Sequence, residues 1–261
     1  MLEKSRLPSP LKVGRTDRGG PMAIPIEGEE TVQESGPENA LSWRLTLNQW
    51  LSPAFPVGAY AFSHGLEQAV QWGHVRDADT CSDWIRAAML FGSCRNDGIF
   101  LVWAFRAQSG KDAADETERI ADLARAFAGS AERLGEMDAL GEAFRLGLAG
   151  VWGGRWGDWP YPVMLGVAAA RHGMAVGEVL GLYFQAFVSN LAAAAIRLVP
   201  LGQVEAQKIV ARLGSLIPDL VAEVERADES EPGESCLGGC ALGVDMAAMG
   251  HENQKVRLFR T

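Results

Sequence analysis

The stretch VLGLYFQAFVSNLAAAAI, between Glu178 and Arg197, carries no charged side chain over 18 residues. A run of that length is either a membrane span or a helix surrounded by other protein. Gln185, Ser189 and Asn190 fall at its centre, which a lipid-facing helix disfavours. No second long apolar run accompanies it in the sequence. We therefore predict the core helix of an all-helical domain, with no membrane partner.

The rest of the chain repeats apolar residues at helical spacing, and no alternating run typical of strands interrupts the pattern. The predicted fold class is all-α, with about ten helices in a single domain over residues 41–250. Residues 1–40 are rich in proline, glycine and mixed charges, so we expect a disordered extension there. Residues 251–261 are expected to form a mobile tail. After a short helix that begins near 41 and ends before Pro53, the expected helices are 61–73, 80–89, 99–106, 113–129, 131–148, 162–172, 176–198, 203–215, 218–227 and 239–249.

The charge of the chain limits its partners. A formal net charge of −9 argues against general binding of nucleic acid, which requires clustered Lys and Arg. An acidic stretch from Asp219 to Glu234 precedes a basic end with Lys255, Arg257 and Arg260. Such a terminus is typical of a docking segment, or else of a solvated linker followed by a frayed end. The beginning of the chain lacks the apolar run of a signal peptide, so we expect a cytoplasmic location.

Two cysteines near the end raise the question of a metal site. Cys236 and Cys240 stand four residues apart, which could hold a metal ion, but no CxxC pair or clustered histidine accompanies them. Packing or incidental placement is the favoured interpretation. The alternative is a nickel carrier that uses His64, His251, Cys236 and Cys240 as ligands.

The motifs of several enzyme classes are absent from the sequence. It contains no GxxxxGK[ST] phosphate loop, no GxSxG elbow, no HExxH and no GxGxxG. His64 and Glu67 would be neighbours on a helix that begins near Ala61, as a general acid–base pair or as a local hydrogen bond. No nucleophile or carboxylate cluster converges on this pair in the sequence. We therefore predict that the chain is not an enzyme.

The stretch PAFPVGAYAFSHGLE, from Pro53 onward, concentrates aromatic residues on a stiff turn. Pro53 and Pro56 fix the backbone near Phe55, Tyr60 and Phe62, which lowers the entropy lost when the turn is ordered. Rigid aromatic side chains are common in protein interfaces. The alternative is that these aromatics fill the core behind the turn.

Four blocks of the sequence stand out: SPAFPVGAYAFSHGLEQAV (52–70), YPVMLGVAAARHG (161–173), NLAAAAIRLVPLGQ (190–203) and AAMGHENQKVRLFRT (247–261). In this order they resemble the signature segments of the urease accessory protein F family (UreF), and the resemblance spans roughly residues 41–261. The sequence departs from the family pattern at three places: His64 replaces a frequent Gln, Lys255 and Val256 replace a Tyr-Ser pair, and Thr261 replaces a terminal Ser.

The resemblance implies a non-enzymatic, all-helical homodimer that acts in the insertion of nickel into urease. Members of that family bridge the accessory protein D (or H) and the nickel-carrying GTPase G, and the assembly docks on apo-urease. The complex handles the nickel, so the resemblance implies no stably bound cofactor. The first block is called the first-motif segment below, and residues 251–261 are called the C-terminal segment.

We expect the first-motif segment and the C-terminal segment to hold the partners jointly. Residues carried over by motif position, together with the turn aromatic Phe55, form the predicted set. These residues are Phe55, Tyr60, Ser63, Gly65, Glu67, Arg197, Gln203, His251, Glu252, Gln254, Arg257, Leu258, Phe259 and Arg260.

Overall fold

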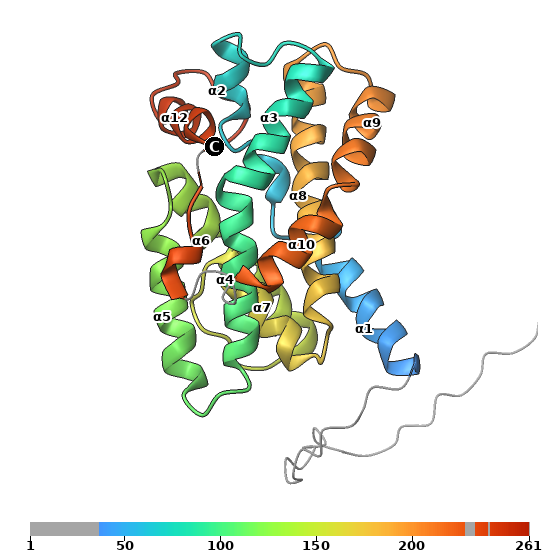
Figure 1. Cartoon of the computed structure of the whole chain (residues 1–261), viewed down its shortest axis with the longest axis vertical. Helices are drawn as coiled ribbons and strands as arrows, with labels where there is room; N and C mark the ends of the chain where they lie inside the picture. Colours follow the sequence, from blue (N-terminus) through green and yellow to red (C-terminus); the bar gives the residue numbers. More distant parts are fainter. Residues whose placement is uncertain (1–36, 228–232, 240, 261) are drawn as a thin grey trace, which may run out of the picture. The chain divides into compact units, whose positions relative to one another are not determined.

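The computed structural model describes residues 37–227, 233–239 and 241–260. Helices and their connections make up this part of the chain, and no strand occurs in it (Figure 1). The predicted all-α class is confirmed. The predicted extension over residues 1–40 lies almost wholly outside the described residues, as do Cys240 and Thr261.

The helices follow one another along the chain with short connections. Their bounds are α1 Pro37–Trp50, η1 Ala59–Ala61, α2 Leu66–Gln71, α3 Ala78–Phe91, α4 Ser93–Ala107, α5 Ala113–Ala126, α6 Ala131–Trp152, α7 Tyr161–Arg171, α8 Val176–Leu198, α9 Gln203–Gly214, α10 Ile217–Glu225, η2 Gly233–Cys236 and α12 Leu242–His251, where η marks a 3-10 helix.

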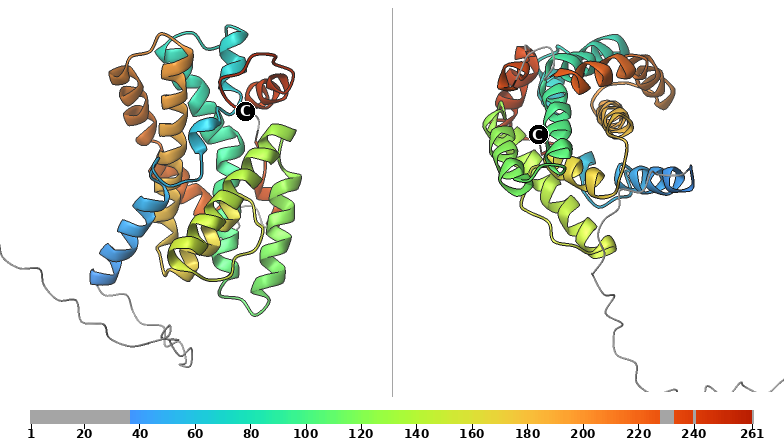
Figure 2. Two further views of the ribbon diagram at one scale, coloured as in Figure 1. Left: turned by 180° about the vertical axis from the view of Figure 1, so that it is seen from behind. Right: turned by 60° about the horizontal axis from the view of Figure 1, so that its bottom comes forward.

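The uncharged run forms α8, which packs against α3, α4, α9 and α10 (Figures 1 and 2). By length and composition alone, with a mean hydropathy of 1.6, it is the one helix of the described part that could cross a membrane. However, its large side chains, such as Phe184 and Leu191, are buried in the shared core. At its centre, the Asn190 amide donates hydrogen bonds to backbone carbonyls of the first-motif segment. The prediction of a buried core helix is confirmed.

Helices α4 and α7 pack closely on each other in the core. Gly166 of α7 faces the carbonyl of Leu101 in α4, and a Cβ atom there would clash with that oxygen. A glycine at the crossing lets the two backbones approach, so that α7 is buried along nearly its whole length.

The first-motif segment differs from the single helix expected over residues 61–73. It forms the short helix η1, then an irregular turn, and α2 begins only at Leu66. Three residues in left-handed conformations cause the break: Gly58 (φ 78°), His64 (φ 50°) and Gly65 (φ 72°). His64 and Glu67 therefore do not lie on one helix, and their predicted pairing as helical neighbours is wrong.

Two other helix starts also differ from the sequence prediction. Helix α3 begins at Ala78 rather than at residue 80, because Asp77 and Thr80 cap each other's backbone. Helix α4 begins at Ser93 rather than at residue 99, and it includes Asn96-Asp97-Gly98, a sequence of residues typical of turns. There Gly98 packs against Phe184, so tertiary contacts override the local signal.

Candidate functional site

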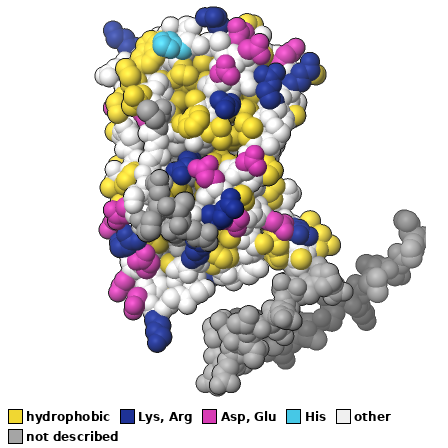
Figure 3. Space-filling model, viewed as in Figure 1, with side chains coloured by type: hydrophobic (Ala, Val, Ile, Leu, Met, Phe, Trp, Pro, Cys, Tyr) yellow, Lys and Arg dark blue, Asp and Glu magenta, His cyan; other side chains and the backbone are white. Residues whose placement is uncertain are grey.

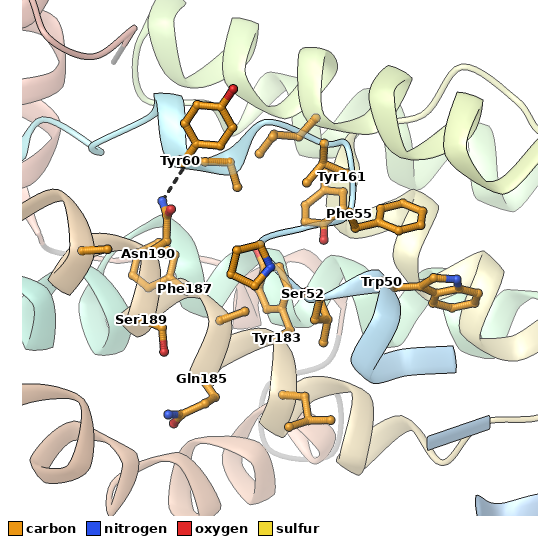
Figure 4. A pocket seen from close by; sticks show the side chains of 18 of the residues that line it. Trp50, Ser52, Phe55, Tyr60, Tyr161, Tyr183, Gln185, Phe187, Ser189 and Asn190 are labelled. Carbon is orange, nitrogen blue, oxygen red and sulfur yellow. Dashed lines mark hydrogen bonds between the residues drawn. The ribbon is translucent and has the colours of Figure 1, made fainter. Parts of the chain in front are cut away.

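The first-motif turn is held from behind and presents one aromatic side chain to solvent. The Asn190 amide of α8 donates to the Ala59 carbonyl at 3.0 Å and to the Phe62 carbonyl at 3.3 Å (Figure 4). Phe62 is buried, whereas Tyr60 is 70% exposed. Each of the two predicted alternatives holds for part of the turn: Phe55 and Phe62 fill the core, whereas Tyr60 is exposed as an interface residue would be.

Glu67, in the first turn of α2, binds the C-terminal segment. Its carboxylate accepts hydrogen bonds from the backbone N–H of Leu258 at 2.8 Å and of Phe259 at 2.9 Å. The Gln254 amide donates to the same carboxylate at 3.2 Å. Glu67 is only 6% exposed, so these donors replace the water that a buried carboxylate needs. A residue of the first motif thus holds the end of the chain in place.

Two further contacts attach the C-terminal segment. The backbone N–H of Arg260 donates to the Ala61 carbonyl at 2.7 Å. The Arg197 guanidinium, near the end of α8, lies 4.6 Å above the centre of the Phe259 ring. Phe259 itself is buried. Residues from three of the four family-like blocks therefore meet at one place.

A buried histidine joins this contact region to α6. His251 is fully buried, with Nδ1 2.8 Å from Glu132 and Nε2 3.3 Å from Glu67. Carboxylates therefore face both ring nitrogens. Arg257 Nη1 donates to the other oxygen of Glu132 at 2.7 Å. The cluster of Glu67, Glu132, His251 and Arg257 is called the clasp below.

Glu132 is the clasp residue that the sequence did not reveal. It stands at the second position of α6 and belongs to none of the four family-like blocks. The helix dipole favours an acidic residue in the first turn of any helix. A glutamate at position 132 therefore does not by itself indicate a contact with a residue more than a hundred positions away. Only the three-dimensional arrangement assigns it to the clasp.

The C-terminal segment differs from the mobile tail that the sequence predicted. From Glu252 to Arg260 it lies against α2, α6 and the first-motif turn. Glu252 also accepts a hydrogen bond at 3.0 Å from the backbone N–H of Ala131, which begins α6. The clasp acceptors and the buried Phe259 ring account for the difference, because these long-range partners cannot be read from the sequence of the tail.

Burial divides the predicted partner-binding residues into two groups. Phe55 packs edge-on against Phe144, with ring centres 5.5 Å apart, and Ser63 Oγ accepts from the backbone N–H of Glu67. Gln203, exposed at the start of α9, makes no hydrogen bond to the clasp among the described residues. The buried members are Phe55, Ser63, Gly65, Glu67, His251 and Phe259; Gln254 is half-buried; the exposed ones are Tyr60, Arg197, Gln203, Glu252, Arg257, Leu258 and Arg260. Buried members can serve a partner only by shaping the surface.

His64 belongs to a second buried cluster, with Asp97, Arg133 and Glu136. Its Nε2 lies 2.9 Å from Glu136, whose other oxygen lies 3.4 Å from Arg133. Arg133 also pairs with Asp97, which accepts a hydrogen bond from the Tyr183 hydroxyl at 2.8 Å. Glu67 takes no part in this cluster, so the His64–Glu67 pair considered for acid–base chemistry does not exist.

Burial and charge act in opposite directions on the two carboxyls of this cluster. Burial alone raises the pKa of Glu136, but the charges of His64 and Arg133 outweigh it and hold that pKa below its usual range. For Asp97 burial prevails over the lowering effect of Arg133, and the pKa is raised. Glu136 is therefore the ionised partner of His64 and Arg133.

The alternative nickel ligands are not brought together as a site. His64 faces Glu136, and His251 faces Glu132 and Glu67. Cys236 is buried at the end of η2, and Cys240 lies outside the described residues. Within the part of the chain that the structure describes, no group of three or more His, Cys, Asp or Glu side chains is arranged to hold a metal ion.

Comparisons with known proteins find one family and relatives that share its description. A family model described as UreF matches residues 75–214. The urease accessory protein UreF of Cereibacter sphaeroides strain KD131 is 47% identical over 217 residues, which cover 83% of this chain and 98% of that protein. The proteins of the same description from Jannaschia sp. strain CCS1 and Roseobacter denitrificans are 44% and 42% identical over 217 residues. Each of these two alignments covers 83% of this chain; they cover 94% of the Jannaschia protein and 93% of the Roseobacter protein.

Proposed function

Because the chain belongs to the UreF family of urease accessory proteins, we propose that it acts as a scaffold in urease maturation. It bridges the accessory protein D (or H) and the nickel-carrying GTPase G, and the assembly then docks on apo-urease. The observation that carries this proposal is the meeting of the first-motif turn, the end of α8 and the C-terminal segment at the clasp. Segments distant in the chain are thereby fixed as one surface.

The exposed side chains around the clasp suit a protein partner. Arg260 offers a planar, permanently charged group for carboxylates, while Tyr60 and Leu258, 70% and 59% exposed, offer apolar contact. Glu67 holds the backbone at Leu258, Asn190 holds the turn that carries Tyr60, and the Ala61 carbonyl holds the backbone at Arg260. Little conformational entropy is therefore left to lose on binding.

An apolar patch on α12 and α2 extends this surface. Leu242, Met246 and Met249 of α12 are 64%, 61% and 48% exposed, although the opposite face of the same helix is buried. Trp72, 46% exposed, lies beside Gly250 at the end of α12. Figure 3 shows apolar side chains over this part of the molecule. Contiguous apolar side chains of this kind mark contact sites for other proteins.

Nickel, in this proposal, is cargo of the assembly rather than a resident ion of the chain. The two histidines of the alternative ligand set already face carboxylates, so binding nickel there would require breaking buried pairs. The proposal further includes a homodimer in the cytoplasm and no catalysis by the chain itself. These parts rest on the family resemblance alone.

Co-purification tests the scaffold directly. The chain, tagged and co-expressed with proteins D (or H) and G, is compared with its Tyr60→Ala and Arg260→Ala variants. The control is Leu146→Ala, which truncates a side chain that is 56% exposed on α6. We expect the two surface variants to capture less of at least one partner and the control to capture the wild-type amount. Unchanged capture of both partners by both variants would contradict the proposal.

The nickel carrier remains the second candidate, and equilibrium dialysis of the purified chain against nickel separates the two. Weak binding, unchanged in a Cys236→Ser/Cys240→Ser variant, is expected of the scaffold. Tight stoichiometric binding that this double variant loses would support the carrier instead.

A further inference from the structure

A recess of about 240 Å³ opens where the first turn of α12 meets the connection from α3 to α4 and the connection from α5 to α6. Helix α12 packs against α3 and α6 in this region (Figure 1). The volume is below the roughly 300–1,000 Å³ that is typical of sites for small organic ligands. It suits one long side chain of another protein, and nothing argued so far gives this recess a role.

One carboxylate in the recess has no counter-charge. Asp245, in the first turn of α12, is half-buried, and its side chain makes no hydrogen bond or ion pair within the described part of the chain. Burial raises the pKa of Asp245, because its surroundings disfavour the charged form. Its oxygens are nevertheless accessible, unlike the fully enclosed nitrogens of Trp50 and Arg133. A helix dipole favours an acidic residue at this position but supplies no cation.

Two exposed aromatic rings line the same recess. Phe91, the last residue of α3, is 49% exposed, and Phe127, which follows α5, is 41% exposed. Phe127 packs edge-on against Phe100, with ring centres 6.2 Å apart, so its position is fixed by the core. Aromatic faces attract cations, and the planar guanidinium of arginine stacks on them. The rings therefore favour a cationic group, and arginine over lysine.

The other charged side chains that line the recess are paired with one another. His64 Nε2 lies 2.9 Å from Glu136, whose other oxygen lies 3.4 Å from Arg133. Arg133 also pairs with Asp97, so two carboxylates face its single positive charge. Among the described residues that line the recess, Asp245 is therefore the charge that is left without a partner. A cation would compensate it, whereas an anion would add to it.

We propose that this recess takes an arginine side chain of a protein partner, with the guanidinium paired to Asp245 and stacked on an exposed phenylalanine ring. Arginine is among the residues that contribute most to protein interfaces, and its apolar stem can lie along the aromatic walls. The inference rests on the proposed scaffold function for the existence of the partner, but the recess itself is tested on the purified chain.

Three amino-acid derivatives test the recess: the Nα-acetyl amides of arginine, citrulline and lysine. Citrulline has nearly the shape of arginine but no charge. Each is titrated into the full-length chain, and binding is followed by the chemical shifts of backbone amides. The arginine derivative should half-saturate the chain below about 10 mM and bind at least about fivefold more tightly than the other two, with shifts concentrated around Phe91, Gly129 and Asp245. No binding of the arginine derivative, or equal binding of either other derivative, would overturn the proposal.

Three variants assign the binding to this recess, with the helical circular dichroism signal as a check on folding. Asp245→Asn removes the charge, so the affinity for the arginine derivative should fall about 10-fold or more. Phe91→Leu keeps apolar bulk but removes the ring, and the affinity should fall about 2- to 5-fold. Asp83→Asn, at an exposed position of α3, is the matched control and should leave the affinity unchanged. Undiminished binding to folded Asp245→Asn would place the site elsewhere and reject the inference.

Co-purification with proteins D (or H) and G connects the recess to a partner. Asp245→Asn should capture less of at least one of them, and Asp83→Asn should capture the wild-type amount. Wild-type capture by Asp245→Asn, with reduced capture by Tyr60→Ala, would reject the recess as a partner site and leave the scaffold function in place. If the wild-type chain captures neither protein, the scaffold function fails and the partner of the recess fails with it, whatever the titrations show.

Discussion

The Glu67 carboxylate accepts a hydrogen bond from the backbone N–H of Phe259 at 2.9 Å, across 192 residues of chain. This contact explains why a buried acidic residue follows the aromatic turn of the first motif. Glu67 is itself buried, and it fixes the segment that we propose contacts a partner. The clasp makes this proposed partner surface a property of the folded domain rather than of a free tail.

Loss of the Glu67 charge should release the C-terminal segment. Glu67→Gln keeps the size of the side chain but replaces one acceptor oxygen by an NH₂ group facing backbone donors. We expect a loss of about 2 kcal/mol in the free energy of unfolding and faster hydrogen exchange at the amides of Leu258 and Phe259. Glu205→Gln, exposed on α9, is the matched control and should change neither quantity. Unaltered exchange at both amides in Glu67→Gln would show that the clasp does not hold the segment.

The anchor at Phe259 should control proteolysis of the C-terminal segment. Phe259→Ala removes a ring that is only 4% exposed, so the segment should detach while the helical core remains folded. Trypsin should then cleave after Lys255 and Arg257 several times faster, as measured by mass spectrometry. Leu258→Ala, at a side chain that is 59% exposed, should cleave at the wild-type rate. Equal rates for both variants would exclude Phe259 as an anchor.

Substitutions at Gly65 and Gly73 distinguish two costs to stability: backbone strain and steric crowding at the first-motif turn. Both Gly65 (φ 72°) and Gly73 (φ 76°) adopt left-handed conformations, but only at Gly65 would a Cβ atom meet a neighbour, 2.7 Å from the backbone nitrogen of Ala248. Gly73→Ala should cost about 1 kcal/mol of stability from strain alone. Gly65→Ala should cost at least about twice as much in urea denaturation. Equal costs would mean that α12 does not pack closely on the turn.

Most of the fold could be predicted from local patterns, because composition and spacing suffice for long amphipathic or apolar helices. Helix α8 is the clearest case, since its uncharged run left only two environments open. The start of α4 could not be predicted, because Asp97 is held within the helix by Arg133, 36 residues away. The break before α2 could not be predicted, because His64 adopts a left-handed backbone conformation, which is rare for residues other than glycine.

The site was accessible to sequence reasoning only in part. The family-like blocks pointed to the residues that meet at the clasp, but nothing local indicated that they contact one another or that Glu132 joins them. The sequence also does not indicate which of these residues are buried. The predicted partner-binding set therefore mixes buried residues, such as Glu67 and His251, with exposed ones, such as Tyr60 and Arg260.

Acid should weaken the second buried cluster through Glu136. Because the pKa of Glu136 is lowered in the folded state, its contribution to stability is present above its unfolded pKa of about 4.3 and is lost as pH falls through the folded value. The raised pKa of Asp97 acts in the opposite sense and partly offsets this loss. Glu136→Gln should therefore be less stable than the wild type at pH 7, and the difference should shrink at acidic pH. Urea denaturation at pH 7, 5, 4 and 3 measures it, and a difference independent of pH would contradict the assignment.

The central claim is that this chain joins two proteins that do not otherwise associate, and the mass of the co-expressed assembly tests it most directly. Proteins D (or H) and G are purified together with this chain, without it, and with its Glu67→Gln variant, and each preparation is weighed by native mass spectrometry. We predict one assembly that contains all three proteins in the first case, no assembly of the other two without this chain, and a reduced yield with the variant. Association of D (or H) with G in the absence of this chain, in the same amount as in its presence, would contradict the account.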